Sequence, residues 1–317
     1  MSGLTRREVL AGAAAGALAG CSRKPKPTPL VSIVRARSYS EDLLDVVRRL
    51  LVEHKVDVRG KRVVLKPNLV EFDPGTTINT HPAVVAAALE AFRSLGAAEV
   101  RIAEGPGHRR NTLELAEAAG YFQTIPRFEE LFTDLNLDDV TRLYVSGAHS
   151  RMKSFYLPRT ALSADLLVSM PKMKCHHWVG ATLSMKNLFG LVPGAVYGWP
   201  KNVLHWAGIQ ECIADLHGLF PRTFAIVDGI VGMEGNGPIQ GTPKPVGVIV
   251  GGADSVAVDA TCCRIMRIDP TLIPYLQMTE DNGQTKAANV HQIGEAVSAV
   301  ATEFRLIPMY EPLRLRA

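Results

Sequence analysis

Short apolar segments alternate with helical patterns along this chain, and this alternation constrains the fold more than any other feature. Apolar runs predict strands at residues 30–34, 62–65, 99–103, 165–170, 223–227 and 246–250. Helical periodicity lies between or after them, at residues 41–55, 81–95, 112–119, 203–219 and 256–266. Parallel strands need crossover connections, which are usually helices. The order therefore predicts an α/β fold with a largely parallel sheet and helices on both faces.

Residues 122–159 do not follow this alternation, and they predict an insertion, a small antiparallel piece or inserted subdomain. Asp254 is predicted to be the N-cap of the last helix. The chain has 317 residues, of which 47% are apolar and 21% charged, as in a globular protein with a sizeable core. We therefore predict one α/β domain over residues 30–317.

The N-terminal segment has the features of an export signal. Residues 5–10 read Thr-Arg-Arg-Glu-Val-Leu, a twin-arginine pattern, and an apolar run of small residues continues to residue 19. This run is shorter than the roughly 20 apolar residues that span a bilayer. It ends in Leu-Ala-Gly-Cys21, which resembles a bacterial lipobox and predicts lipidation of Cys21. The alternative is a plain signal peptide with a chance cysteine.

Three segments follow from this interpretation: a signal at residues 1–21, a Pro-rich tether at 22–29 and the folded domain. The twin-arginine export machinery is then a partner of the precursor. We expect the exported chain to be lipid-anchored to a cell membrane and to face the periplasm or exterior.

The charge of the chain lies mostly in its N-terminal segment. The formal net charge is +4, from 35 basic and 31 acidic residues. Five of the basic residues and one acidic residue precede Pro27, which leaves 30 of each from Pro27 onward. A neutral body without a basic stripe argues against nucleic acid as a partner.

Four cysteines remain after Cys21, and none belongs to a C-x-x-C pair. Their spacing does not resemble that of zinc or iron–sulfur sites. A disulfide is compatible with export but cannot be deduced from the sequence. Cys212, Cys262 and Cys263 lie in apolar helical runs, which predicts buried thiols.

Polar residues gather after the predicted strands. Ligands of open parallel sheets bind beyond the carboxyl ends of the strands. Exposure to solvent is the alternative explanation for polar residues at any one strand end. The convergence of several such ends predicts a binding site, and the residues assigned to substrate binding are Lys66, Asn68, Glu104, Thr182, Ser184, Asn187 and Gly235.

Residues 171–190 are the richest in candidate functional groups. In an extended chain, alternate residues share a face, which groups Lys172 with Lys174 and His176, and Thr182 with Ser184 and Lys186. Such a set suits an anion, and a desolvated lysine can act as a base or a Schiff-base nucleophile. A surface basic loop is the alternative. The predicted catalytic residues are Lys172, Lys174, Lys186, His176 and His81, with the two histidines handling protons.

Histidines and carboxylates near the same strand ends allow a metal site. The candidate ligands are His177, His205, Asp228 and Glu234. No histidine pair has the i, i+4 spacing of a helical zinc motif. The Gly-rich runs at 104–107 and 234–238 match neither a dinucleotide fingerprint nor a P-loop, so nucleotide binding is not predicted.

Several segments together resemble a known family. They are Lys66-Pro67-Asn68, Thr80-His81-Pro82, Glu104-Gly105, residues 171–176, residues 182–190, His205, Asp228-Gly229, residues 234–238 and residues 257–260. Their order and spacing resemble the family called domain of unknown function 362, over most of residues 60–270. That family has no assigned reaction. Some members are fused to ferredoxin-like cysteine motifs, which this chain lacks, so the resemblance implies no iron–sulfur cluster here.

A looser similarity is to lactate racemase-type enzymes. Those enzymes use a lysine-tethered nickel pincer cofactor, with histidines as ligand and proton-transfer groups. The shared feature is a Lys- and His-rich site in an α/β protein. The similarity adds one mechanism to test.

The leading hypothesis is an exported, membrane-anchored enzyme that acts on a small anionic substrate. One alternative is a metal- or redox-cofactor-binding protein, which would purify with metal or colour. Another is a non-catalytic ligand-binding lipoprotein, which would retain a ligand without turnover.

Overall fold

The computed structural model describes residues 27–316. The twin-arginine pattern, Cys21 and most of the tether lie outside these residues, so the predictions made for them stay predictions. Within residues 27–316, no helix is both long enough and apolar enough to cross a bilayer.

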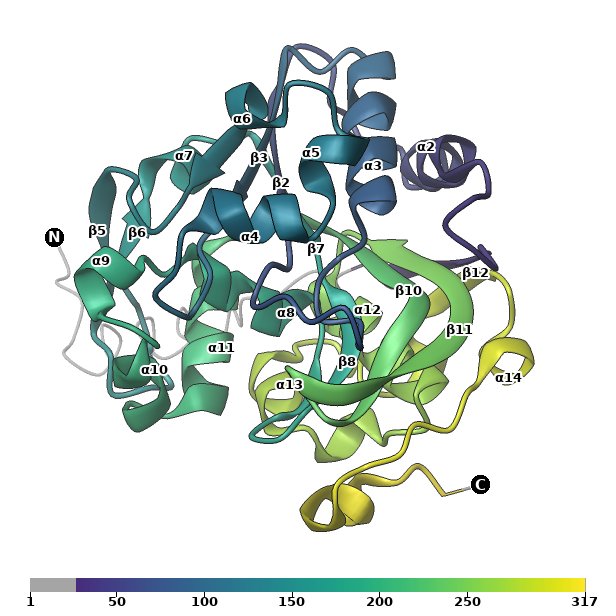
Figure 1. Cartoon of the computed structure of the whole chain (residues 1–317). Coiled ribbons are helices and arrows are strands. Elements are labelled where there is room, and N and C mark those ends of the chain that lie inside the picture. The colour runs from purple at the N-terminus through teal and green to yellow at the C-terminus, as the bar shows by residue number, and fades with distance from the viewer. Residues whose placement is uncertain (1–26, 317) are drawn as a thin grey trace, which may run out of the picture.

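A ten-stranded mixed sheet forms the centre of the described chain (Figure 1). Its main path runs in the order β12 (His291–Gly294), β1 (Leu30–Arg35), β11 (Gln240–Gly252), β10 (Thr223–Asn236), β7 (Leu166–Met170), β2 (Arg62–Pro67), β3 (Glu99–Glu104) and β4 (Phe132–Asp134). The pairs from β10 to β4 are parallel, whereas β11 is antiparallel to both β10 and β1. The predicted α/β fold with a largely parallel sheet is confirmed.

Two further strands branch from β10. After β7, the chain passes Pro171 and enters β8 (Lys172–His176), which pairs in parallel with the later part of β10. β9 (Gly180–Thr182) then pairs antiparallel with β8. β10 contacts β7 through Ala225 and β8 from Asp228 onward, so one long strand supports both. The first part of the segment at residues 171–190, which is rich in candidate functional groups, is therefore an extension of the sheet.

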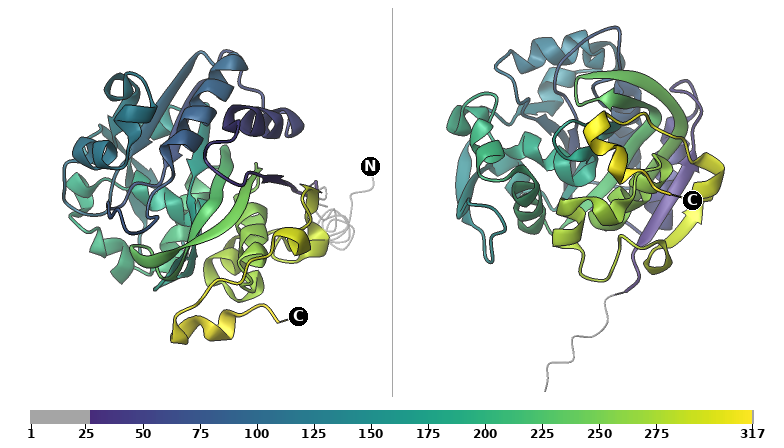
Figure 2. Two further views of the ribbon diagram at one scale, coloured as in Figure 1. Left: turned by 45° about the vertical axis from the view of Figure 1, so that its right-hand side comes forward. Right: turned by 90° about the horizontal axis from the view of Figure 1, so that it is seen from below.

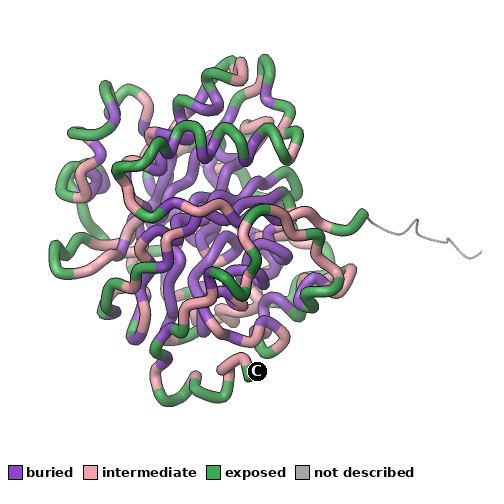
Figure 3. The backbone as a smooth tube through the Cα atoms, turned by 90° about the vertical axis from the view of Figure 1, so that its right-hand side faces the viewer, coloured by how far each residue is buried: buried purple, intermediate pink, exposed green. Residues whose placement is uncertain are grey.

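Helices cover both faces of the sheet, as predicted. α2 (Leu43–Glu53) and α3 (Pro82–Ser94) contribute to one apolar cluster, and α11 (Ile209–Leu219), α12 (Ser255–Ile265) and α13 (Pro274–Thr279) contribute to the other (Figure 1). Successive strand residues alternate between the two clusters: Val63 and Leu65 belong to the first, and Val64 to the second. The buried backbone in Figure 3 lies along this sheet and the helix faces against it.

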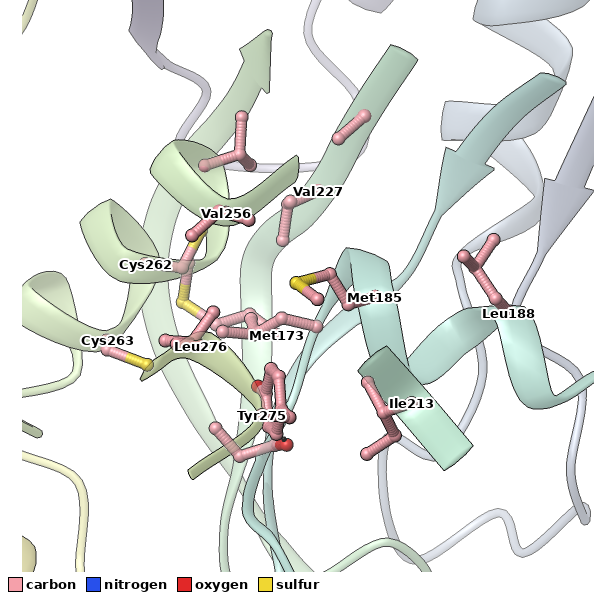
Figure 4. Close-up of a cluster of buried hydrophobic side chains, with 14 of the residues drawn as sticks. Met173, Met185, Leu188, Ile213, Val227, Val256, Cys262, Cys263, Tyr275 and Leu276 are labelled. Carbon is pink, nitrogen blue, oxygen red and sulfur yellow. Dashed lines mark hydrogen bonds between the residues drawn. The ribbon is translucent and has the colours of Figure 1, made fainter. Parts of the chain in front are cut away.

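The second cluster lies directly behind β8. Figure 4 shows Met173 of β8 and Met185 near Cys262 of α12 and Tyr275 of α13. All four cysteines of the described residues are free and buried, which confirms the predicted buried thiols. Met173 thus anchors β8 to the core, while its sequence neighbours point to the other face.

Shorter elements complete the connections. They are α4 (Thr112–Ala118), α5 (Tyr121–Thr124), α6 (Phe128–Leu131), α7 (Arg159–Leu162), α8 (Ser184–Asn187), η1 (Leu188–Leu191), α9 (Gly194–Tyr197), α10 (Asn202–Trp206), η2 (Pro270–Leu272), η3 (Ala287–Asn289), α14 (Val297–Val300) and η4 (Pro308–Leu313). The C-terminal segment, yellow in Figure 2, returns beside α12, where the Thr302 amide donates to the Ile265 carbonyl.

Several sequence expectations can be compared directly with these elements. β5 (Val140–Tyr144) and β6 (Ser154–Pro158) form a separate antiparallel pair, which is the small piece expected between residues 122 and 159. Asp254 caps α12 by accepting from the Ala257 amide, as predicted. The single helix expected at 203–219 is wrong: Gly208, with φ of 108°, separates α10 from α11.

Candidate functional site

A cavity of about 380 Å³ opens beside the carboxyl ends of β2 and β3, with β8 and α8 contributing to its walls. The structure brings many of the predicted site residues to this cavity. The predicted residues that line it are Lys66, Asn68, Glu104, Lys174, His176, His177, Thr182, Lys186, Asn187 and His205. Their meeting follows from the parallel arrangement of the strands that precede them.

The floor of the cavity contains a buried ion pair. Lys66 Nζ lies 2.6 Å from Glu104 Oε2 and 3.0 Å from Asn187 Oδ1. Burial lowers the pKa of Lys66, and the Glu104 carboxylate opposes that shift. A Cβ at Gly190 would overlap both Glu104 and Lys66, so this position has room only for glycine. The pair closes the inner end of the cavity.

Three further lysines face the cavity, and within the described residues none is hydrogen-bonded or ion-paired to a carboxylate. Lys174 Nζ donates to the carbonyls of Ile78 (2.9 Å) and Pro238 (3.2 Å). Lys201 Nζ donates to the Gly105 carbonyl (2.6 Å). Lys186 Nζ lies 3.9 Å from the centroid of the Phe189 ring. These ammonium groups retain unused donors toward the cavity.

Burial lowers the pKa of all three lysines. It takes those of Lys186 and Lys201 to about 7, with Lys66 adding to the shift and Glu104 opposing it. The pKa of Lys174 falls well below the ordinary lysine value, first through burial and then through Lys186 and Lys172. The cavity therefore favours either neutral amines or a bound anion that restores their charge.

His176 and His177 differ in which ring nitrogen carries the proton. His176 Nδ1 accepts from the Trp178 amide (3.0 Å), so the neutral ring carries its proton on Nε2. Burial, followed by Lys186, lowers the His176 pKa well below its usual value. His177 Nδ1 donates to the Gly237 carbonyl (2.7 Å). Burial and Lys186 lower the pKa of His205 to about 4, so this ring is neutral at pH 7.

Some polar atoms of the cavity lack a hydrogen-bond partner within residues 27–316. They are Asn68 Oδ1, Thr182 Oγ1 and His205 Nδ1, and all three are buried. Buried polar atoms in folded proteins are nearly always paired, by protein groups, water or a ligand. The cavity therefore offers unused hydrogen-bonding groups to a polar molecule or to water.

Lys201 and Trp178 belong to the cavity but were not among the predicted residues. Lys201 follows no predicted strand. It adopts a left-handed backbone conformation (φ 66°) just before α10, which is uncommon for a residue other than glycine. A rule based on strand ends could not find it. Trp178, in the turn after β8, lies within residues 171–190, and its position among the candidate polar residues is a signal that could have identified it as an apolar part of the site.

Three of the predicted site residues lie outside the cavity and form a separate hydrogen-bonded network. Lys172 Nζ lies 2.6 Å from Asp228 Oδ2 and donates to the Tyr39 hydroxyl (2.9 Å). The backbone amide of His81 donates to Asp228 Oδ2, and the His81 ring stacks on Tyr39 at 3.7 Å. His81 Nδ1 also accepts from the Ala83 amide as the N-cap of α3. None of Lys172, His81 and Asp228 lines the cavity, and their roles in chemistry stay predictions.

The expectation that Thr182, Ser184 and Lys186 share a face of an extended chain is wrong. β9 ends at Thr182 and α8 begins at Ser184, so the period of side-chain directions changes there. Ser184 turns into the interior, where its hydroxyl and amide both donate to Asp259. Lys186, two residues into the helix, returns to the cavity.

The candidate metal ligands do not meet. His177 and His205 line the cavity, Asp228 belongs to the Lys172 network, and Glu234 pairs with Lys244 at 3.2 Å. Within the described part of the chain, no group of three or more His, Cys, Asp or Glu side chains is arranged to hold a metal ion. Gly235, next to Glu234, lies outside the cavity lining, and its amide donates to the Arg305 carbonyl.

Two solved structures are similar to part of this chain. The lactate racemase apoprotein from Thermoanaerobacterium thermosaccharolyticum superposes with a TM-score of 0.46 and 16% identity over 75% of this chain. A Thermotoga maritima protein superposes with a TM-score of 0.40 and 13% identity over 70% of this chain. The chain covers 57% of each of these two structures.

A sequence relative is the thylakoid-associated protein of Synechocystis sp., which is 30% identical over 271 residues, 81% of each chain. The family model "Domain of unknown function (DUF362)" matches residues 63–264, which include the strands and the lysines that form the cavity. The chain therefore belongs to the DUF362 family.

Proposed function

We propose that this protein is an enzyme that binds a small anionic substrate in the cavity and uses Lys186 as its reactive amine. The observation that carries the proposal is the set of lysines 174, 186 and 201 around one space. Glu104 is the single carboxylate among the described residues that line that space, and it already pairs with Lys66. Buried positive groups without partners are costly, and a bound anion would remove that cost.

The unpaired polar atoms support the same conclusion. A carboxylate or phosphate offers acceptors to Lys174, Lys201 and the Thr182 hydroxyl. An anion bound there raises the pKa of the lysines that contact it, because it stabilises their charged form. Binding and lysine protonation are therefore coupled.

The arrangement supports proton transfer at a carbon next to a carbonyl. The pKa of Lys186, about 7, leaves a large share of its amine neutral at physiological pH. That amine would take the proton from carbon, and the electron pair would move onto the carbonyl oxygen. His176, with its proton on Nε2, would donate a hydrogen bond to that oxygen. Return of the proton from Lys186 completes a turnover without another reactant.

The proposal extends to location. The twin-arginine pattern and Cys21 support export and attachment to a membrane through lipid. The Synechocystis relative is described as thylakoid-associated, which agrees with membrane association of this chain. Added lipid mass on the peptide that contains Cys21, in mass spectra of the membrane-bound protein, would support the anchor, and a soluble chain with unmodified Cys21 would overturn it.

A ligand screen tests the anion site. The full chain with Cys21→Ser, which lacks the predicted acylation site, would be screened by thermal shift against carboxylates and inorganic phosphate. A matching anion at about a hundredfold its Kd should raise Tm by about 4–5 °C. Lys174→Met and Lys201→Met should lose the shift, while Lys244→Met, at a lysine outside the cavity, should keep it.

Turnover is tested with the anion that binds. Exchange of its carbon-bound hydrogen for solvent deuterium, followed by NMR, should require Lys186. Absence of any anion effect in the screen would overturn the proposed site. Tight binding without exchange or other conversion would favour the non-catalytic ligand-binding lipoprotein.

A further inference from the structure

The cavity has a charged floor and an apolar rim. Lys66, Lys174 and Lys201 lie at its floor with their side chains almost completely buried. Trp178 lines the same cavity with 51% of its surface exposed. The polarity of the lining therefore changes from the inside toward solvent.

The rim is formed by two facing segments and the Trp178 ring. The turn between β10 and β11 contributes Pro238 and Ile239, flanked by the polar Asn236 and Gln240, and the loop before α10 contributes Pro200. Trp178 stands against His205, with ring centroids 4.6 Å apart, and against His177 at 4.8 Å. These contacts hold a large apolar side chain at the entrance, although it is half exposed.

The rim and the floor are directly connected. Lys174 Nζ donates to the carbonyl of Pro238, so the apolar turn is fixed above the buried ammonium group. Phe189, beneath the rim, is nearly buried and contacts Lys186 Nζ. The Pro238 turn and the Phe189 ring therefore lie beside Lys174 and Lys186 in the cavity.

The size of the cavity agrees with a substrate that fills both zones. Pockets that hold organic ligands of drug size measure about 300–1,000 Å³, and this cavity measures about 380 Å³. A two-carbon acid or a single phosphate would occupy only the floor and leave the apolar side chains of the rim in contact with water. Apolar surface around a binding site gains free energy when a ligand covers it.

We infer that the substrate is an amphiphilic anion, with its charged head at Lys174 and Lys201 and its apolar part against Trp178, Pro238 and Ile239. This inference rests on the proposed function, because it takes the lysine floor as the anion site. It adds the chemical class of the rest of the molecule: a hydrocarbon chain or an aromatic ring attached to the acid group.

The experiment measures Kd by calorimetry for acetate, butyrate and octanoate with the full chain carrying Cys21→Ser. Each buried methylene contributes up to about fourfold in affinity, so octanoate should bind at least about tenfold more tightly than acetate. Trp178→Ala should weaken octanoate about tenfold more than it weakens acetate. Trp206→Ala, at a 72% exposed tryptophan of α10 outside the cavity lining, should change neither.

Two more measurements show where each end of octanoate lies. Lys174→Met should abolish octanoate binding, and 1-octanol, which lacks the charge, should bind far more weakly than octanoate. Octanoate binding that survives Lys174→Met, or that Trp178→Ala leaves unchanged, would overturn the inference.

The possible results distinguish a failure of this inference from a failure of the proposed function. If acetate and octanoate bind equally and both need Lys174, the anion site stands and the amphiphilic substrate is wrong. If no carboxylate binds and inorganic phosphate also fails, the proposed function itself is wrong.

Discussion

Lys66 Nζ and Glu104 Oε2 lie 2.6 Å apart at the carboxyl ends of two neighbouring parallel strands, with both side chains buried. Register places β2 against β3, so the two residues reach the same edge of the sheet. Asn187 adds a third partner from α8. This contact ties the sheet to the segment that carries Lys186.

The buried pair makes Glu104→Gln a test of the floor. The substitution leaves the Lys66 ammonium buried without a carboxylate and should lower the free energy of unfolding by about 3–5 kcal/mol. Urea unfolding at neutral pH measures the change. Glu90→Gln is the control, because Glu90 forms an exposed pair with Arg93 and should cost less than about 0.5 kcal/mol. Equal losses in the two variants would contradict the assigned burial.

Replacing the two lysines that lie two residues apart on β8 should change stability by very different amounts. Lys172→Met removes the partner of buried Asp228 and should destabilise the fold by about 3–5 kcal/mol. Lys174→Met removes a buried cation that has no carboxylate partner in the described chain, and should cost no more than about 1 kcal/mol. Anion binding should be lost in Lys174→Met. Urea unfolding and calorimetry on both variants check this, and equal destabilisation would contradict it.

Lys186 should react unusually fast with amine reagents near neutral pH. Its pKa is lowered to about 7, chiefly by burial, so the reactive neutral amine increases as pH rises through 7. Brief acylation followed by peptide mass mapping should show half-maximal labelling of Lys186 near pH 7. Lys244 provides the comparison within the same chain. Half-maximal labelling near the ordinary lysine value of 10.5 would contradict the assignment.

The same pKa has a consequence for stability. The folded-state pKa of Lys186 lies below the ordinary value of 10.5, so the unfolded chain binds its proton more readily between about pH 7 and 10.5. This residue therefore makes the protein more stable as pH rises through that window. Lys186→Met should reduce the gain in unfolding free energy between pH 7 and about pH 9, as measured by urea unfolding at both values. An unchanged gain would show that Lys186 titrates normally.

Thr182→Val tests the unpaired hydroxyl in the cavity. Valine keeps the shape and removes an oxygen that has no partner within residues 27–316, so stability without ligand should stay equal or rise by about 1 kcal/mol. Affinity for the anion should fall. In Thr223→Val the lost hydroxyl donates to the Phe220 carbonyl at 2.7 Å, and the control should lose stability by about 1 kcal/mol. Thermal unfolding with and without anion separates the two effects.

Much of the sheet could be predicted because buried strands are nearly continuous apolar runs. The same reasoning located Lys66 and Glu104, since parallel strands bring their carboxyl ends to one edge. It could not separate Lys172 from Lys174, because the two share a face of β8 and only the position of Asp228 on β10 distinguishes them. Periodicity also failed after Thr182, where the chain changes from strand to helix within two residues.

Other features depend on contacts that no local pattern contains. Lys201 reaches the Gly105 carbonyl across 96 positions of the chain. Tyr39 lies 189 residues from Asp228, to which its hydroxyl donates. Gly208 falls inside the helix predicted over residues 203–219 and instead lies between two helices, because its φ of 108° does not continue a helix.

The direct passage from β7 through Pro171 into β8 fixes Lys174 and His176 in the central sheet. Pro200 and the turn at Pro238 lie in loops that line the same cavity. We expect exchanges at Pro238 and Ile239 to change which anions bind, because Lys174 keeps its place in the sheet when that turn changes. The proposed anion site would then be set largely by the sheet, and its selectivity by the loops.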